Sequence, residues 1–198
     1  MFGADVDWGP VSSWVAAILT FLAVTLALLV AFGVFDSLKA PKIRLTFQQK
    51  EPWCRTTKLA VGSDAFWVRV GVENVGRKPA RGCIGRVISV TTDGEVRQDV
   101  DPIQLRWAGV PRAAAFRPLD IRRGQREFLN VLFLRARARW QIVTYTEGDF
   151  DPGFSTELKA DQEHILELAI FSDNADTATR SIVANFRILE DIVTVRWT

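Results

Sequence analysis

Residues 11–35 have the sequence VSSWVAAILTFLAVTLALLVAFGVF, which contains no charged side chain. The nearest charges are Asp7 before the stretch and Asp36 after it. At about 1.5 Å per residue, a helix over this stretch would be roughly 37 Å long, enough to cross a hydrocarbon core of about 30 Å. The core helix of a soluble domain normally carries a polar stripe, and this stretch has none. The sequence therefore predicts a transmembrane helix over residues 11–35.

The flanking residues favour a retained anchor over a cleaved signal peptide. Asp5 and Asp7 precede the stretch without any Lys or Arg, whereas a secretory signal begins with a basic segment. Basic residues follow within the range of the positive-inside rule: Lys39, Lys42, Arg44 and Lys50. We therefore predict a single-pass protein of the cell (inner) membrane, with an outer N-terminus and a cytoplasmic domain. The opposite orientation, with an extracytoplasmic domain, is the alternative.

The rest of the chain has the length of one domain. We divide the sequence into a short N-terminal segment (1–10), the transmembrane helix (11–35), a juxtamembrane linker (36–42) and a β-sandwich domain (43–198). All 25 basic residues but only 20 of the 23 acidic ones follow residue 36, so this part carries a net charge of +5. Cys54 and Cys83 are the only cysteines. A cytoplasmic domain would keep both reduced, and an extracytoplasmic one would allow a disulfide between them.

Alternating apolar and polar residues predict strands after residue 42. Residues 43–47 form a first short strand, and the clearest strand follows in AFWVRVGVEN. Its two faces are Phe66, Val68, Val70 and Val72 on one side, and Trp67, Arg69, Gly71 and Glu73 on the other. The next strand places Cys83, Gly85, Val87 and Ser89 on one face, and Ile84, Arg86, Ile88 and Val90 on the other. Asp93-Gly94 predicts a tight hairpin turn.

The remaining segments also suggest strands and turns. Residues 101–118 predict an irregular connection that contributes Leu105 and Trp107 to the core, and residues 119–121 a short edge strand. Residues 126–145 have strand periodicity as one long or two broken strands. HILELAIFS and TRSIVANFRIL predict a hairpin across the polar loop 173–177, and IVTVRW predicts a last strand. Many short strands without an amphipathic helix indicate a mainly β fold, an antiparallel β-sandwich.

A strand followed by N-x-G-x-x-x-A-x-x-C, in VRVGVENVGRKPARGC, resembles the immunoglobulin-like domains related to the CARDB group. The whole chain resembles uncharacterised bacterial membrane-anchored proteins with such a domain. The shared features are the N-terminal anchor, the basic juxtamembrane segment, Leu105-Arg106-Trp107, and the terminal hairpin ELAIFSDNADTATRSI. This resemblance implies an immunoglobulin-like sandwich, and it supplies no catalytic residue.

The polar residues predict no catalytic, cofactor-binding or metal site. His164 is the only histidine, and we expect it near the surface at a strand edge rather than in a pair with Cys54 or Cys83. Asp149 and Asp151 have the spacing that begins a calcium loop, but the later ligand positions hold Gly153 and Ala160. We expect an acidic surface turn there. Three other polar residues are explained as turn formers that bond their own backbone: Asp173, Asn174 and Asp176.

Arg135, Arg137 and Arg139 would share one side of an extended strand. They form a candidate contact for an anionic surface, against the alternative of a solvated strand face. Lipid head groups are preferred because the anchor holds the domain near a membrane, and no nucleic acid is expected. The sequence suggests a non-catalytic membrane-anchored binding or scaffolding module that meets other proteins through sheet edges or loops. An accessory subunit of a larger membrane complex is the alternative, and an enzyme is the least favoured.

Overall fold

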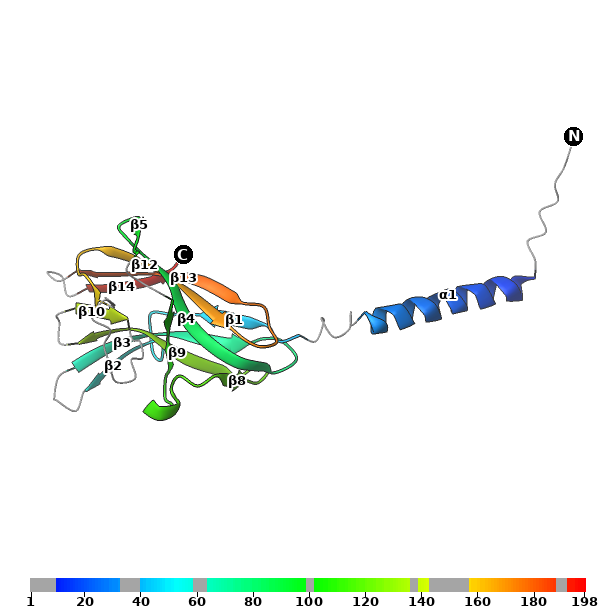
Figure 1. Cartoon of the computed structure of the whole chain (residues 1–198), viewed down its shortest axis with the longest axis horizontal. Coiled ribbons are helices and arrows are strands. Elements are labelled where there is room, and N and C mark those ends of the chain that lie inside the picture. The colour runs from blue at the N-terminus through cyan, green and yellow to red at the C-terminus, as the bar shows by residue number, and fades with distance from the viewer. Residues whose placement is uncertain are drawn as a thin grey trace, which may run out of the picture. The chain divides into compact units, whose positions relative to one another are not determined.

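The computed structural model describes residues 10–32, 40–58, 64–98, 102–135, 139–142, 157–187 and 192–198. The chain divides into two compact units, Met1–Ala40 and Pro41–Thr198, shown in Figure 1.

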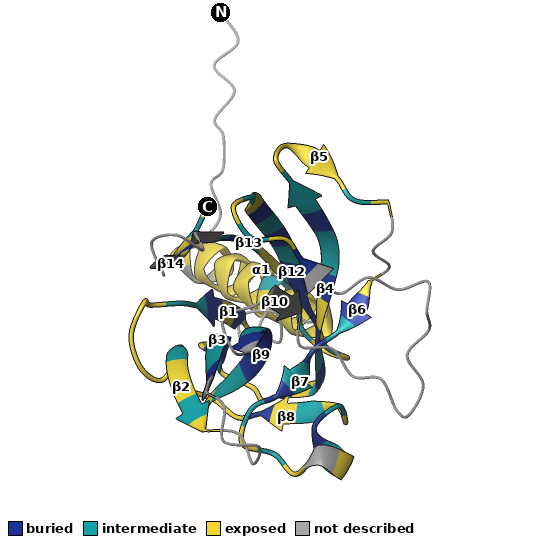
Figure 2. Cartoon of the chain, turned by 90° about the vertical axis from the view of Figure 1, so that its left-hand side faces the viewer, coloured by how far each residue is buried: buried dark blue, intermediate teal, exposed yellow. Residues whose placement is uncertain are grey.

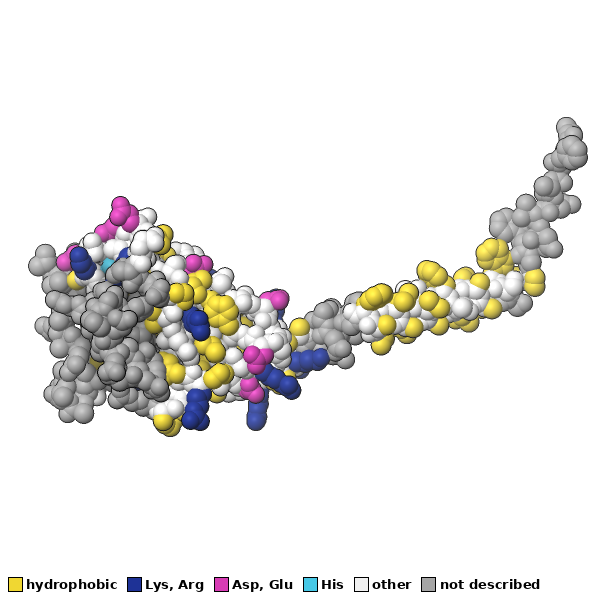
Figure 3. All heavy atoms as spheres, in the orientation of Figure 1, with side chains coloured by type: hydrophobic (Ala, Val, Ile, Leu, Met, Phe, Trp, Pro, Cys, Tyr) yellow, Lys and Arg dark blue, Asp and Glu magenta, His cyan; other side chains and the backbone are white. Residues whose placement is uncertain are grey.

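The first unit contains one long apolar helix, α1 (Val11–Ala31). Its Ser13–Ala31 segment is long and apolar enough to cross a membrane, and none of its residues is buried (Figure 2). The hydroxyls of Thr20 and Thr25 donate to the carbonyls of Ala16 and Phe21, at 2.9 and 2.8 Å, so they present no unpaired donor to the surroundings. Along the visible face of α1, the coloured side chains in Figure 3 are all hydrophobic. The helix ends at Ala31, and residues 33–35 of the predicted span lie outside the described residues.

The second unit consists of two antiparallel sheets, which confirms the predicted β-sandwich (Figure 1). Sheet I has the order β1-β3-β9-β10-β11, with β2 also paired to β3 and β7 to β9. Its strands are β1 (Ile43–Thr46), β2 (Cys54–Lys58), β3 (Asp64–Asn74), β7 (Arg106–Trp107), β9 (Arg126–Arg135), β10 (Arg139–Ile142) and β11 (Glu157–Leu158). The immunoglobulin-like character stays a prediction.

Sheet II has the order β14-β13-β12-β4-β5, with β6 and β8 also paired to β4. Its strands are β4 (Ala80–Thr92), β5 (Glu95–Val96), β6 (Ile103–Gln104), β8 (Leu119–Ile121), β12 (Glu163–Phe171), β13 (Ala178–Arg187) and β14 (Ile192–Trp197). A single turn of 3₁₀ helix, η1 (Arg112–Ala114), is the one helical segment described after residue 42. The β12–β13 hairpin and the last strand are therefore confirmed.

The core lies between the two sheets. Apolar and polar residues alternate along β3, so its apolar side chains point into this core. Val68, Val70 and Val72 are completely buried, and they face β4 and β12 residues such as Val87 and Leu166 across the interior (Figure 2). The connection over residues 102–118 contributes Leu105 and Trp107, both buried as predicted. Gly85 of β4 allows the sheets to approach closely, because a side chain there would collide with the Leu129 side chain of β9.

The alternation predicted for β4 holds only over its first half. Gly85 and Val87 share one face as expected, and that face is turned to the core. A β-bulge then adds one residue, Ile88, opposite the Glu167–Leu168 step of β12. The extra residue exchanges the faces, since side chains alternate with period two. Ser89 consequently donates to Glu167 on the outer face, and Val90 is buried instead. The prediction for these last two residues was wrong.

Candidate functional site

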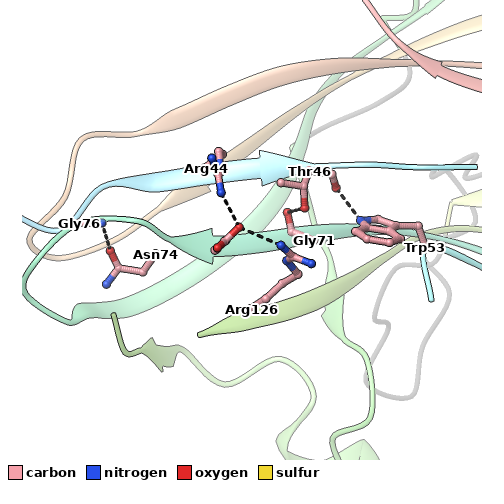
Figure 4. A network of polar contacts seen from close by, with 8 residues as sticks. Arg44, Thr46, Trp53, Gly71, Asn74, Gly76 and Arg126 are labelled. Atoms are coloured by element: carbon pink, nitrogen blue, oxygen red, sulfur yellow. Dashed lines mark hydrogen bonds and ion pairs between the residues drawn. The ribbon is translucent and has the colours of Figure 1, made fainter. Parts of the chain in front are cut away.

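One buried side chain, Asn74 at the end of β3, organises the end of the sandwich where the chain enters the second unit. Its Oδ1 accepts from the backbone N–H of Gly76 at 2.9 Å and of Lys42 at 3.2 Å. Its Nδ2 donates to the carbonyls of Lys78, at 2.8 Å, and Ile121, at 2.9 Å. Asn favours this local turn because its carbonyl mimics a backbone acceptor. The N-x-G pattern seen in the sequence thus joins three segments of chain, and Figure 4 shows the bond between Asn74 and Gly76.

The three joined segments carry exposed basic side chains. We define the entry rim as Lys42 before β1, Arg77 and Lys78 in the β3–β4 loop, and Arg122 and Arg123 in the β8–β9 turn. The β8–β9 turn is held in place by backbone bonds, because Gly124 N–H donates to the Asn74 carbonyl at 2.8 Å. Gly124 has a φ of 72°, which a residue with a side chain adopts only with strain. In Figure 3 basic and acidic side chains are both visible at this end of the sandwich.

The β12–β13 loop closes the same end from the side of sheet II. Asn174 accepts from Arg81 N–H at 2.9 Å and donates to the Pro79 carbonyl at 3.0 Å. The sequence interpretation of Asn174 as a turn former that bonds its own backbone was therefore wrong: its bonds reach across to β4. Asp173 packs against Gly82, and Gly82 N–H donates to Asp120 at 2.9 Å. These two carboxylates occupy the sheet II side of the end.

In the first half of the outer face of sheet I, two arginines share one carboxylate. Glu73 accepts from Arg44 at 2.9 Å and from Arg126 at 3.1 Å, and these hydrogen bonds hold the pKa of its carboxyl below the usual range (Figure 4). Arg126 also lies over the ring of Trp53, with 5.6 Å from guanidinium to ring centre. The indole donates to the Thr46 carbonyl at 3.1 Å. The charged and aromatic side chains of this half therefore contact partners within the protein.

The second half of this face gathers positive charge around two aromatic rings. Trp67 and Phe133 stack with their centres 5.3 Å apart, and Arg106 lies over Trp67 at 5.3 Å. Arg55 pairs with Trp67 across β2 and β3, and Arg69 donates to the buried Asn130 at 2.9 Å. Burial, together with the charges of Arg55 and Arg106, holds the pKa of Arg69 below its usual value, and Glu51 opposes this effect. We call this half the arginine face and define it by Arg55, Trp67, Arg69, Arg106 and Phe133.

The arginines singled out in the sequence lie at the far end of the same sheet. Arg135 ends β9 and pairs with Ala65 of β3 and with Arg139, the first residue of β10. A hairpin, rather than one extended strand, therefore brings these two positions together, and Arg137 lies outside the described residues. Ala65 and Asn74 are nine residues apart in β3, or about 30 Å, so Arg135 and Arg139 are remote from the entry rim. The lipid contact expected of them stays a prediction.

His164 differs from its expected surface position. It lies in the central strand β12, and only 2% of it is exposed. Its Nδ1 is 2.9 Å from the Thr92 hydroxyl, and its Nε2 is 2.7 Å from the Lys159 carbonyl. Burial lowers the pKa of His164, and the charge of Arg97 acts in the same direction, against the Lys159 hydrogen bond and Asp93. The prediction was wrong because His164, like the apolar residues next to it on the same side of β12, lies on the inner face of sheet II.

The two cysteines are both free thiols, on different sheets. Cys54 in β2 is partly exposed, and Cys83 in β4 is buried. Burial, reinforced by Asp120 and Asp173, raises the pKa of Cys83 to about 11. Burial also raises the pKa of Cys54. Neither thiol is therefore activated as a nucleophile.

Among the residues that the structure describes, no group of three or more His, Cys, Asp and Glu side chains could hold a metal ion. The loop with Asp149 and Asp151 lies outside this part of the chain, so its expectation as an acidic turn stays a prediction.

No protein-family model matches the chain, and a search of curated proteins finds no similar sequence. The resemblance to CARDB-related domains therefore stays a prediction.

Proposed function

We propose that the protein is a single-pass membrane protein whose sandwich is a non-catalytic binding module. The apolar helix α1 is the anchor, because a soluble protein would leave this uncharged surface facing water. The basic residues that follow the helix favour a cytoplasmic sandwich at the cell membrane.

We further propose that the arginine face binds an acidic segment of a partner protein. The observation that carries this proposal is the contrast between the halves of one sheet face. In the first half both arginines bind the carboxylate of Glu73, whereas in the second half Glu51, which acts on Arg69 only through its charge, is the one acidic residue among those described that does so. Half-buried arginines that repel one another are costly, and carboxylates of a partner would relieve that cost. Arginine and tryptophan are also the residues that dominate binding energy at protein interfaces.

Charge reversal of an exposed arginine tests this proposal. Arg55→Glu removes one cation of the arginine face without removing a packed side chain, since Arg55 is exposed. Arg86→Glu is the matched control, because Arg86 is an exposed arginine of β4 that lies over Phe171 in the other sheet. The full-length protein is extracted from membranes in mild detergent, and co-purified proteins are quantified by mass spectrometry.

The expected result is a partner with an acidic segment that co-purifies with wild type and with Arg86→Glu. Its recovery should fall at least about tenfold with Arg55→Glu and should decrease with added salt. Equal recovery with all three proteins would contradict the arginine face as the binding surface.

A further inference from the structure

The entry rim gathers five basic residues that are distant in sequence. Lys42, the β3–β4 loop and the β8–β9 turn are joined by the four side-chain hydrogen bonds of Asn74. Because Asn74 is completely buried, this arrangement is part of the folded core rather than a chance approach of surface loops. Among the described residues, Lys42, Arg77, Arg122 and Arg123 have no carboxylate within ion-pair distance.

Several acidic residues of the same end contact other parts of the protein, and Glu127 accepts from Gln125 at 2.6 Å. Glu73 pairs with Arg44 and Arg126, and Asp120 accepts from Gly82 N–H. Asp173 packs against Gly82 on the side of sheet II, and Asp176 lies three residues farther along the same loop. The segments of the entry rim, Lys42, residues 75–79 and residues 122–125, contain no acidic residue and therefore carry an excess of positive charge.

The place where the chain enters the sandwich is also at this end. Lys42 donates to Asn74, and Val75 N–H donates to the Lys42 carbonyl at 2.8 Å, so the first residues of the second unit run directly beside the β3–β4 loop. Nine residues, 32–40, connect the end of α1 to Pro41. Nine residues cannot span more than about 32 Å, so an anchored helix would keep the entry rim within that distance of the membrane.

We propose that the entry rim binds the phosphate groups of anionic phospholipids in the leaflet next to which the sandwich emerges. This inference rests on the proposed membrane anchor, and it adds a second contact that would orient the sandwich on the membrane. Guanidinium groups bind lipid phosphates with two parallel hydrogen bonds, and each basic residue at an anionic surface contributes about fivefold to association. Val75, an apolar residue that is 39% exposed, stands beside the basic residues and can enter the headgroup layer.

The test uses the full-length protein reconstituted into lipid nanodiscs. One set contains phosphatidylcholine alone, and the other an equal mixture of phosphatidylcholine and phosphatidylglycerol. Amide hydrogen exchange is measured for residues 75–79 and 122–125. The variant Arg77→Gln/Arg122→Gln/Arg123→Gln removes three charges of the entry rim. The control, Arg135→Gln/Arg137→Gln/Arg139→Gln, removes three charges of the same type, and two of these residues, Arg135 and Arg139, lie at the far end of sheet I.

We expect exchange in both segments to slow at least about tenfold in the anionic discs, and this protection to fade at high salt. The entry-rim variant should lose the protection, and the control variant should keep it. Equal exchange in both disc types, or loss of protection in the control variant alone, would overturn the entry rim as the lipid site. Protection in phosphatidylcholine discs by added inorganic phosphate would assign the rim to free phosphate instead. A protein that does not enter the discs would contradict the anchor itself.

Discussion

Replacing Asn74 with alanine should destabilise the sandwich more than any other single change at its entry end. The substitution removes four hydrogen bonds and leaves two N–H groups and two carbonyls without their partner. Each such bond contributes about 0.5–1.5 kcal/mol net, so we expect the free energy of unfolding to fall by roughly 3–5 kcal/mol. With a urea dependence of about 2 kcal/mol per molar, the unfolding midpoint would move by about 2 M.

The assay is urea unfolding of the detergent-solubilised protein, followed by the fluorescence of its buried tryptophans. Asn174→Ala is the matched control, because it removes two exposed hydrogen bonds at the same end and should cost about 1 kcal/mol. Asn74→Asp would keep the acceptor but place a carboxylate against the carbonyls of Lys78 and Ile121, and should be at least as harmful as alanine. The reasoning is refuted if Asn74→Ala costs no more than Asn174→Ala.

Three further predictions follow from burial and from the flanking charges. Because the pKa of His164 is lowered in the native protein, the unfolded chain binds a proton at higher pH than the native one. The free energy of unfolding should therefore fall as the pH drops below about 6.5, by at most about 1.4 kcal/mol per pH unit. His164→Gln should flatten that slope in the unfolding free energy, and an unchanged slope would argue against it. Iodoacetamide at pH 8 should label the buried Cys83 only after unfolding, whereas the more exposed Cys54 should react first. Peptide mass spectrometry measures both labelling rates, and equal rates for Cys83 in native and unfolded protein would contradict this prediction. Alkaline phosphatase fused after Thr198 should be inactive and a fluorescent protein bright, and the reverse pattern would place the sandwich outside the cytoplasm.

The strands that could be predicted from the sequence are those whose alternation is uninterrupted. β3 has a clear period of two, and the β12–β13 hairpin consists of two apolar runs on either side of a polar loop. Asp93 and Gly94, between β4 and β5, have the positive φ of a tight hairpin turn. The second half of β4 could not be predicted, because one inserted residue reverses its faces without a change in composition. The position of His164 was predicted wrongly for a related reason, because the polarity of neighbouring residues in the sequence does not show whether a strand is central in its sheet.

The candidate sites depend on contacts that no local pattern contains. The N-x-G motif predicts a turn at Asn74, but its bonds to Lys42 and Ile121 join segments 79 residues apart. The arginine face draws its residues from β2, β3, β7 and β9, so their proximity follows from strand order. A partial signal was present in β3, where Trp67 and Arg69 occupy successive positions on the face opposite the core.

The most direct test of the membrane anchor is the intact mass of the protein that stays with membranes after an alkaline wash. We expect a pelleted protein with the mass of the whole sequence, 22.2 kDa, because α1 crosses the bilayer and is retained. A protein released into the supernatant would show that α1 does not span the membrane. A shorter protein that begins after the apolar segment would show that α1 is a cleaved signal.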